Sequence, residues 1–165
     1  MWDSSMTIML LEGTRDTLYM TLLATFFGYV FGLPMGIALM VTAKDGIQPS
    51  SRGGQRVYAV IYKVLDVIVN ITRSIPFLIL LILVIPLTKL IVGKSYGSAA
   101  TIVPLTIAAA PFIARMVESS LKEVDRGVIE AAQSMGASTG RIIWSVLLVE
   151  ARTSLLVGVT IAIGT

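Results

Sequence analysis

Four stretches of the chain are nearly free of charge and have the length of membrane-spanning helices, at residues 17–43, 57–90, 95–116 and 142–165. A transmembrane helix needs about 20 mostly apolar residues, because the hydrocarbon core of a bilayer is about 30 Å thick. The second stretch joins an uncharged segment to one that carries Lys63 and Asp66. The charge-free run 153–165 is too short to span alone, so we expect the chain to end inside its fourth span.

Composition agrees with this pattern. Hydrophobic residues make up 55% of the chain and charged residues 14%, whereas soluble domains carry about 25% charged residues. The pattern predicts one all-α domain over residues 1–165, a polytopic helical membrane protein. The chain has no cysteine and no histidine, which removes thiolate metal ligands and the usual general base. We therefore expect neither a catalytic nor a metal site on this chain.

The basic residues fall mostly on one side of the predicted membrane. That side holds Lys44, Arg52, Arg56, Lys63, Arg115, Lys122, Arg126, Arg141 and Arg152. The other side holds Arg15, Lys89 and Lys94. Connections rich in Lys and Arg stay in the cytoplasm, so we expect the N-terminus outside and the polar segment 117–141 inside. The connection 44–56 is rich in Gly, Ser, Gln and Pro and is predicted to be a loop.

Small residues and prolines mark the predicted spans. Gly28, Gly32 and Gly36 recur every four residues on one helix face, which favours close packing of another helix over a pore-lining role. Prolines that can kink a helix or serve as flexing points are Pro34, Pro76, Pro86, Pro104 and Pro111. The sequence alone does not show whether these prolines act as hinges or only shape the packing of the helices.

Asp66 and Arg73 are the ionisable residues nearest a predicted membrane core. They lie two helical turns apart on one face, too far for direct contact. A charge at this depth usually faces a cavity or the protein interior. The pattern favours the alternative that both lie at the cytoplasmic end of the second span.

The cytoplasmic segment predicts a short helix that needs a partner. Asp125 can cap its N-terminus and Gly136 can end it. One apolar face is formed by Val128, Ala131, Ala132 and Met135. Such a face has to lie on a membrane surface or enter a groove on another protein, and its small alanines favour the groove. Ser138 can cap a second helix that leads from Thr139 into the last span.

This segment resembles a known family signature. Glu130-Ala131-Ala132 is followed by three residues, Gly136, nine residues and then Val146-Leu-Leu-Val149. The spacing is similar to the cytoplasmic motif of ABC importer permeases, in which proline occupies the place of Val149. The segments 73–77, 102–106 and 110–118 resemble the methionine importer permease family, and the resemblance covers nearly the whole chain.

The resemblance implies a homodimeric permease of the bacterial inner membrane. It implies five spans with the N-terminus outside, a cytoplasmic ATPase dimer that binds ATP and Mg, and a methionine-binding protein outside, with surrounding lipid. No cofactor is then expected on this chain. The docking residues would be Asp125, Arg126, Val128, Ile129, Glu130, Ala131, Ala132, Met135 and Gly136. Docking would drive alternating access and import methionine.

Several alternatives and one further hypothesis remain at the level of sequence. The chain could serve another small amino acid, or act as a self-sufficient channel or secondary carrier. Carriers usually need buried carboxylates or broken helices at mid-membrane, and the uncharged cores of the predicted spans contain no carboxylate. Since Val149 replaces the proline, the helix from Thr139 is predicted to continue unbroken into the membrane. A large charged residue at Ala132 is expected to abolish transport without preventing membrane insertion.

Overall fold

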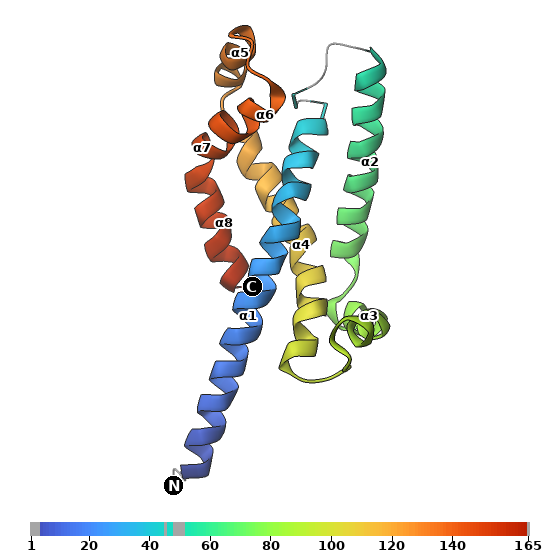
Figure 1. The fold of residues 1–165 in the computed structure, drawn as a ribbon, viewed down its shortest axis with the longest axis vertical. Coiled ribbons are helices and arrows are strands. Elements are labelled where there is room, and N and C mark those ends of the chain that lie inside the picture. Colours follow the sequence, from blue (N-terminus) through green and yellow to red (C-terminus); the bar gives the residue numbers. More distant parts are fainter. Residues whose placement is uncertain (1–3, 45, 48–51, 165) are drawn as a thin grey trace.

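The computed structural model describes residues 4–44, 46–47 and 52–164, and these residues form helices without strands (Figure 1). The elements in chain order are α1 (Ser4–Thr42), α2 (Arg52–Ser74), α3 (Phe77–Val92), α4 (Ser98–Lys122), α5 (Arg126–Ser134), α6 (Thr139–Ile142), the π-helix η1 (Ile143–Leu147), α7 (Leu148–Glu150) and α8 (Arg152–Gly164). The expected all-α class is confirmed. Part of the expected loop 44–56, and Thr165 of the fourth expected span, lie outside the described residues.

Two helices are individually long and apolar enough to cross a membrane. They are α1 and α4, and the count within the described residues rises to four if each of two bent helix pairs forms one span. The first pair is α2 with α3, bent by 111°, and the second is the segment Thr139–Glu150 with α8, bent by 70°. Apolar side chains cover much of the outer surface, including Met9, Leu78 and Leu90, which are 72%, 73% and 82% exposed. Such a surface suits lipid or other apolar partners better than water.

The contact between α1 and α4 is the largest in the bundle, and α4 also touches α2, α3 and α8. Gly28, Gly32 and Gly36 form the α1 side of this contact. A Cβ added at Gly32 would lie 2.7 Å from the carbonyl oxygen of Ala110, and one added at Gly36 would lie 2.6 Å from that of Ala114. Hydrogen is therefore the only side chain that fits at these positions without moving α4.

Pro76 lies at the sharp bend between α2 and α3. It lacks an amide hydrogen and disfavours helical geometry at the preceding residue, so α2 ends at Ser74. The Pro76 carbonyl then accepts from the amides of Ile79 and Leu80, which starts α3. The expected span 57–90 is consequently not one continuous helix. The other prolines among the described residues, Pro34, Pro86, Pro104 and Pro111, lie inside helices that continue past them.

The fourth helix runs further than the sequence predicted. Residues 117–122, assigned above to the cytoplasmic segment, belong to α4. Val117 and Leu121 are buried, and Glu118 accepts from cations one turn away on either side. Pairing at these spacings supports a helix, so α4 continues through this charged turn.

The hypothesis of an unbroken helix from Thr139 into the membrane is wrong. The segment turns by 70° at Ala151, although valine occupies position 149. Ala151 has φ −77° and ψ −1°, and its amide donates to the carbonyl of Leu147 at 2.9 Å. Ile142, Leu147 and Ala151 are all at most 4% exposed. Burial of these side chains fixes the segment 139–150 on the core, so the turn needs no proline.

A glycine exchange tests the α1–α4 contact. We expect Gly36→Ala to lower the free energy of unfolding by about 1–3 kcal/mol, because the new methyl group overlaps α4. Gly13→Ala is the control, since its Cβ would meet nothing within 4 Å. Unfolding of the purified protein in detergent measures both. Equal stability of the two variants would contradict the tight contact.

Candidate functional site

The short helix α5 has a defined cap at each end. Asp125 Oδ1 accepts from the amide of Gly127 at 2.7 Å. At the other end Gly136 adopts φ +76°, a left-handed conformation that favours glycine. The amide of Gly136 donates to Gln133 at 2.9 Å and that of Ala137 donates to Ala132 at 3.1 Å. This is the Schellman arrangement, so both termini of a nine-residue helix are fixed locally.

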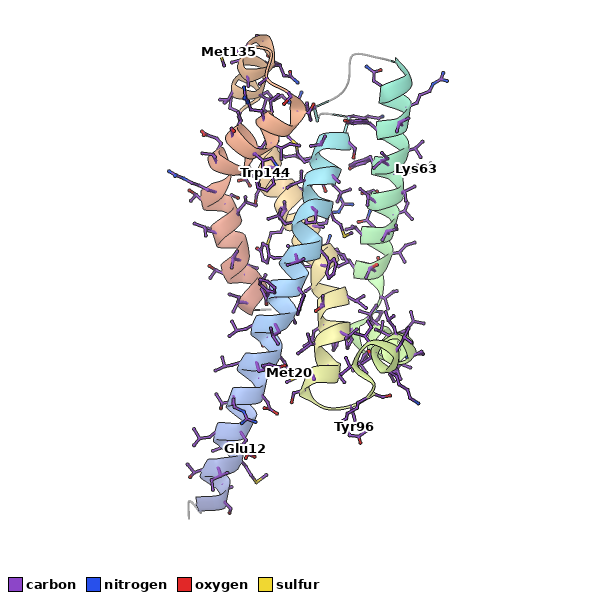
Figure 2. All side chains as sticks on the ribbon, viewed as in Figure 1. Glu12, Met20, Lys63, Tyr96, Met135 and Trp144 are labelled. Carbon is purple, nitrogen blue, oxygen red and sulfur yellow. The ribbon has the colours of Figure 1, made fainter. Side chains whose placement is uncertain are left out.

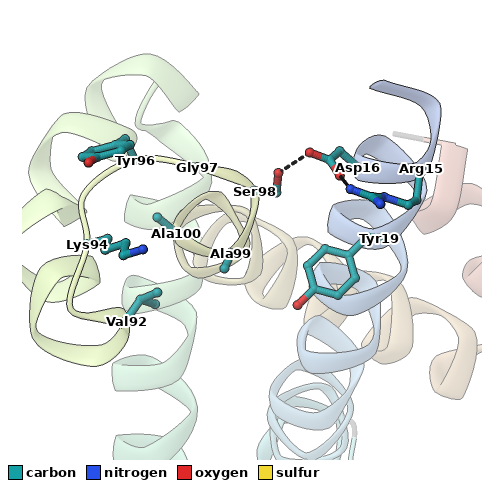
Figure 3. Close-up of a pocket in the computed structure, with 10 residues that line it drawn as sticks. All are labelled: Arg15, Asp16, Tyr19, Val92, Lys94, Tyr96, Gly97, Ser98, Ala99 and Ala100. Carbon is teal, nitrogen blue, oxygen red and sulfur yellow. Dashed lines mark hydrogen bonds and ion pairs between the residues drawn. The ribbon is translucent and has the colours of Figure 1, made fainter. Parts of the chain in front are cut away.

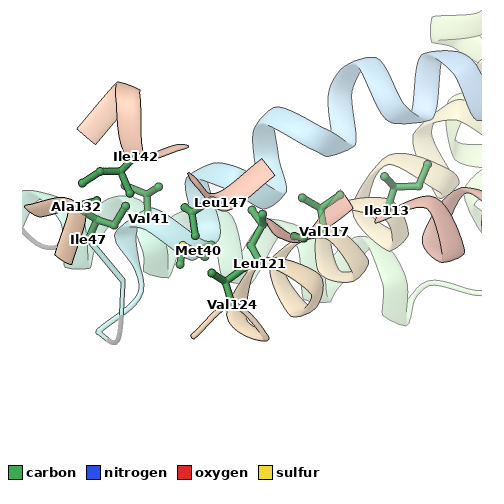
Figure 4. Close-up of a cluster of buried hydrophobic side chains, with 11 residues drawn as sticks. Met40, Val41, Ile47, Ile113, Val117, Leu121, Val124, Ala132, Ile142 and Leu147 are labelled. Atoms are coloured by element: carbon green, nitrogen blue, oxygen red, sulfur yellow. The ribbon is translucent and has the colours of Figure 1, made fainter. Parts of the chain in front are cut away.

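One side of α5 is packed on the chain's own core. Ala132 is 6% exposed and belongs to a cluster that includes Val41, Ile47, Val124 and Ile142 (Figure 4). This cluster joins α5 to the end of α1 and to α6. The helix therefore cannot shift without moving the elements that it packs against.

Next to Ala132, the rest of the apolar face of α5 is exposed. We call Val128, Ala131 and Met135 the outer stripe; Val128 is 42% exposed, Met135 is 81% exposed, and Ala131 is also exposed. Met135 lies at one end of the molecule, and Tyr96 and Glu12 lie toward the other (Figure 2). A stripe of this kind on a capped helix is a surface for a partner groove.

Ala132 lies on the same apolar face as the outer stripe, as the sequence predicted, but its side chain packs into the chain's own core. The periodic pattern is correct, but the apolar face is wide, and Ala132 at its edge packs against other residues of this chain. A charge at Ala132 would enter the chain's own core. Loss of transport in such a variant would thus report misfolding as readily as failed docking.

Polar groups flank the outer stripe. Arg126, Glu130 and Gln133 are exposed, and Ser134 Oγ donates to the Glu130 carbonyl at 2.9 Å. Ile129 is half-buried and packs beside Ala132. The expected docking residues thus divide into an outer set and an inner set.

An ion network links α2 to α4, and sequence reasoning missed its central member, Arg115. Arg115 donates to Asp66 and, at 3.0 Å, to Asn70 Oδ1, both on α2. It also donates to Glu118 at 2.7 Å. Asp66 therefore faces α4, and Arg73 remains exposed on α2. The spacing of Asp66 and Arg73 within one helix could not indicate that Asp66 pairs with Arg115, which lies 49 residues away in the chain.

A cavity of about 540 Å³ lies at the other end of the bundle, between α1 and the α3–α4 connection (Figure 3). Arg15, Asp16 and Tyr19 line it from α1, and Lys94 and Tyr96 line it from the connection. Ser98 Oγ donates to Asp16 Oδ2 at 2.7 Å, which ties the two elements together. The sequence analysis did not identify this cavity, because its walls come from segments far apart in the chain.

Comparisons with known proteins place the chain among transport proteins. Residues 53–165 match the family described as "Binding-protein-dependent transport system inner membrane component". The chain is 47% identical over 161 residues to the D-methionine transport system permease protein MetI of Salmonella typhimurium, covering 98% of this chain and 70% of that protein. It is 48% identical over 155 residues to the same-named protein of Escherichia coli K12, covering 94% and 68%.

Solved structures give a similar picture. An inward-facing form of the MetNI methionine ABC transporter superposes with a TM-score of 0.90 at 46% identity, over 98% of this chain and 71% of that one. An amino acid ABC transporter with histidines superposes with a TM-score of 0.58 at 23% identity, which supports the fold alone.

Substitutions at the neighbouring Ala131 and Ala132 distinguish the exposed part of α5 from its buried part. We expect Ala132→Asp to lower the free energy of unfolding by about 3 kcal/mol or more, since a carboxylate would be buried without a partner. Ala131→Asp should change it by less than about 1 kcal/mol, because position 131 is exposed. Unfolding in detergent compares the pair. Comparable losses would show that α5 is not oriented as described.

Proposed function

The chain belongs to the family of binding-protein-dependent transport system inner membrane components, and from this premise we propose that it is the permease subunit of an ATP-driven methionine importer. In this proposal it forms the translocation path and a separate subunit hydrolyses ATP. The similarity to D-methionine permeases over 98% of the chain supports methionine as the substrate. Both stereoisomers are candidates.

The observation that carries the proposal is the two-sided helix α5. Its caps make it rigid, its inner side is buried, and its outer stripe is exposed. We infer that the outer stripe enters a groove on the ATPase. Ala131 permits close approach there, and the exposed Glu130 is placed to pair with a basic group at the rim.

Movement of α5 would reach the membrane through the shared core. The buried cluster contains residues of α1, α4, α5, α6, η1 and the α7–α8 bend. Interiors packed this closely transmit displacement instead of absorbing it. When ATP closes the ATPase dimer, two docked α5 helices would be drawn together. The helices attached to them would then switch between inward-facing and outward-facing arrangements as rigid bodies.

The assembly we propose contains two copies of this permease, two ATPase subunits and an extracytoplasmic methionine-binding protein. ATP and Mg would be bound by the ATPase subunits, with no cofactor on this chain. The distribution of Lys and Arg supports a cytoplasmic α5 and an external N-terminus. In this orientation the cavity beside Arg15 and Lys94 opens on the external side.

Docking is tested by a charge in the outer stripe. We expect Ala131→Asp to prevent co-purification with the ATPase and to abolish ATP-driven uptake, because an uncompensated carboxylate would enter an apolar contact. Gln133→Asp, an exposed site on the same helix outside the stripe, should retain both. Pull-down from membranes and uptake into proteoliposomes measure the effects. An Ala131→Asp protein that binds the ATPase normally would refute docking through the stripe.

Substrate identity is tested by competition. Proteoliposomes containing the permease, its ATPase and its receptor should accumulate labelled methionine only with internal ATP. Excess unlabelled methionine should suppress uptake at least tenfold more effectively than equal leucine or glutamine, roughly the discrimination of 1.4 kcal/mol. Preference for another amino acid would overturn the choice of methionine while leaving the ATP-driven permease intact.

A further inference from the structure

Glu118 is a buried carboxylate that holds two cations. Its side chain is 3% exposed, and it accepts from Arg115 Nη1 and Lys122 Nζ, each at 2.7 Å. Arg115 is shared with Asp66 on α2. We call Asp66, Arg115, Glu118 and Lys122 the α2–α4 ion chain. It connects the middle of α2 to the last turn of α4.

The ion chain lies where α4 leads into α5. Lys122 is the final residue of α4, and Asp125 caps α5 three residues later. Val117 and Leu121, interleaved with the ion chain, belong to the buried cluster that also contains Ala132. A displacement of α5 therefore acts directly on the turn of α4 that carries Glu118.

Apolar packing of α2 against the bundle centres on one buried residue, which is flanked by partly buried side chains. Val69 is the one buried residue among the α2 side chains that the structure describes, packing against Leu39 and Ala114. Apolar contacts of this size allow helices to slide, because dispersion and burial have little directional preference. The guanidinium of Arg115 is different. It is planar and rigid, and Glu118 holds it from the same helix, so its bonds to Asp66 and Asn70 on α2 persist only in one relative placement of the two helices.

The surroundings make this placement costly to lose. Asp66 and Arg115 lie on helices of the apolar bundle, with side chains 31% and 22% exposed. A charge that loses its partner in such surroundings is strongly unfavourable. The ion chain therefore favours joint movement of α2 and α4 over separation of the two helices.

We propose that Arg115 is a positioning residue for transport, which makes α2 follow the α5 end of α4. On α4, Glu118 orients the guanidinium of Arg115. On α2, Asp66 and Asn70 accept hydrogen bonds from this guanidinium. The inference rests on the proposed function, since it concerns how ATPase-driven movement of α5 spreads through the permease. It predicts that a weakened ion chain uncouples ATP hydrolysis from uptake without preventing docking.

The main test compares Asp66→Asn with Arg73→Gln in the complete transporter in proteoliposomes. Asp66→Asn removes the negative charge that Arg115 meets on α2, and Arg73→Gln removes an exposed charge from the same helix. We expect Asp66→Asn to retain ATPase association and hydrolysis but to import roughly threefold less methionine per ATP, or lower still. Arg73→Gln and the charge-conserving Asp66→Glu should stay nearer the wild-type ratio.

A distance measurement separates this role from general destabilisation. The chain contains no cysteine, so Lys63→Cys on α2 and Ser119→Cys on α4 introduce its only thiol labels. Between nucleotide-free and vanadate-trapped complexes, spin labels there should keep one narrow distance within each permease copy when the chain is otherwise wild-type. Asp66→Asn should broaden or shift that distance in the trapped state. If Asp66→Asn does not fold, Asn70→Ala, which removes the 3.0 Å acceptor, should show the same change more weakly.

The outcomes are distinguishable. An unchanged import ratio and distance in Asp66→Asn, or in Asn70→Ala where that variant replaces it, would overturn the role of the ion chain while leaving the importer function intact. Equal loss of coupling in Arg73→Gln would overturn it too, since the effect would then not depend on the partner of Arg115. Absence of ATP-driven uptake by the wild-type transporter would overturn the proposed function and this inference together.

Discussion

The close approach of α1 and α4 is the contact on which the rest of the bundle depends. It exists because Gly32 and Gly36 present no side chain to the α4 backbone. With α1 against one side, α4 can contact α2, α3 and α8 around the remainder of its surface. The residues that close the core at the α5 end of the bundle, including Met40 and Val41 at the end of α1, are brought into place by the same contact.

The helix α5 shows how a docking element can be both anchored and available. An isolated nine-residue helix is marginal in water, since nucleation is costly and few hydrogen bonds follow. Two caps and the burial of Ala132 supply the missing stability from within the chain. The outer stripe is therefore preorganised, and a partner need not meet the entropic cost of ordering it.

The two sharp bends have different physical origins. At Pro76 the covalent structure of the backbone prevents a continuous helix, so the bend is encoded locally. At Ala151 no residue forbids a helix, and the chain turns because Leu147 and Ala151 are buried on one side of the turn while α8 packs along α4. Only the first kind of bend is visible in a sequence. This explains why the expectation attached to Val149 failed. Pro76 was one of five proline candidates for a kink, and α2 ends just before it.

The sequence alone determined the helical class, the glycine face of α1, both caps of α5 and the family signature around Glu130. These follow from periodicity and from residues whose backbone chemistry acts locally. Tertiary structure decided which helix the glycines meet, that Ala132 turns inward, and that Asp66 pairs with Arg115. Those outcomes depend on which surfaces meet across long separations in the chain. A periodic pattern specifies a face of a helix, but not the neighbour that covers it.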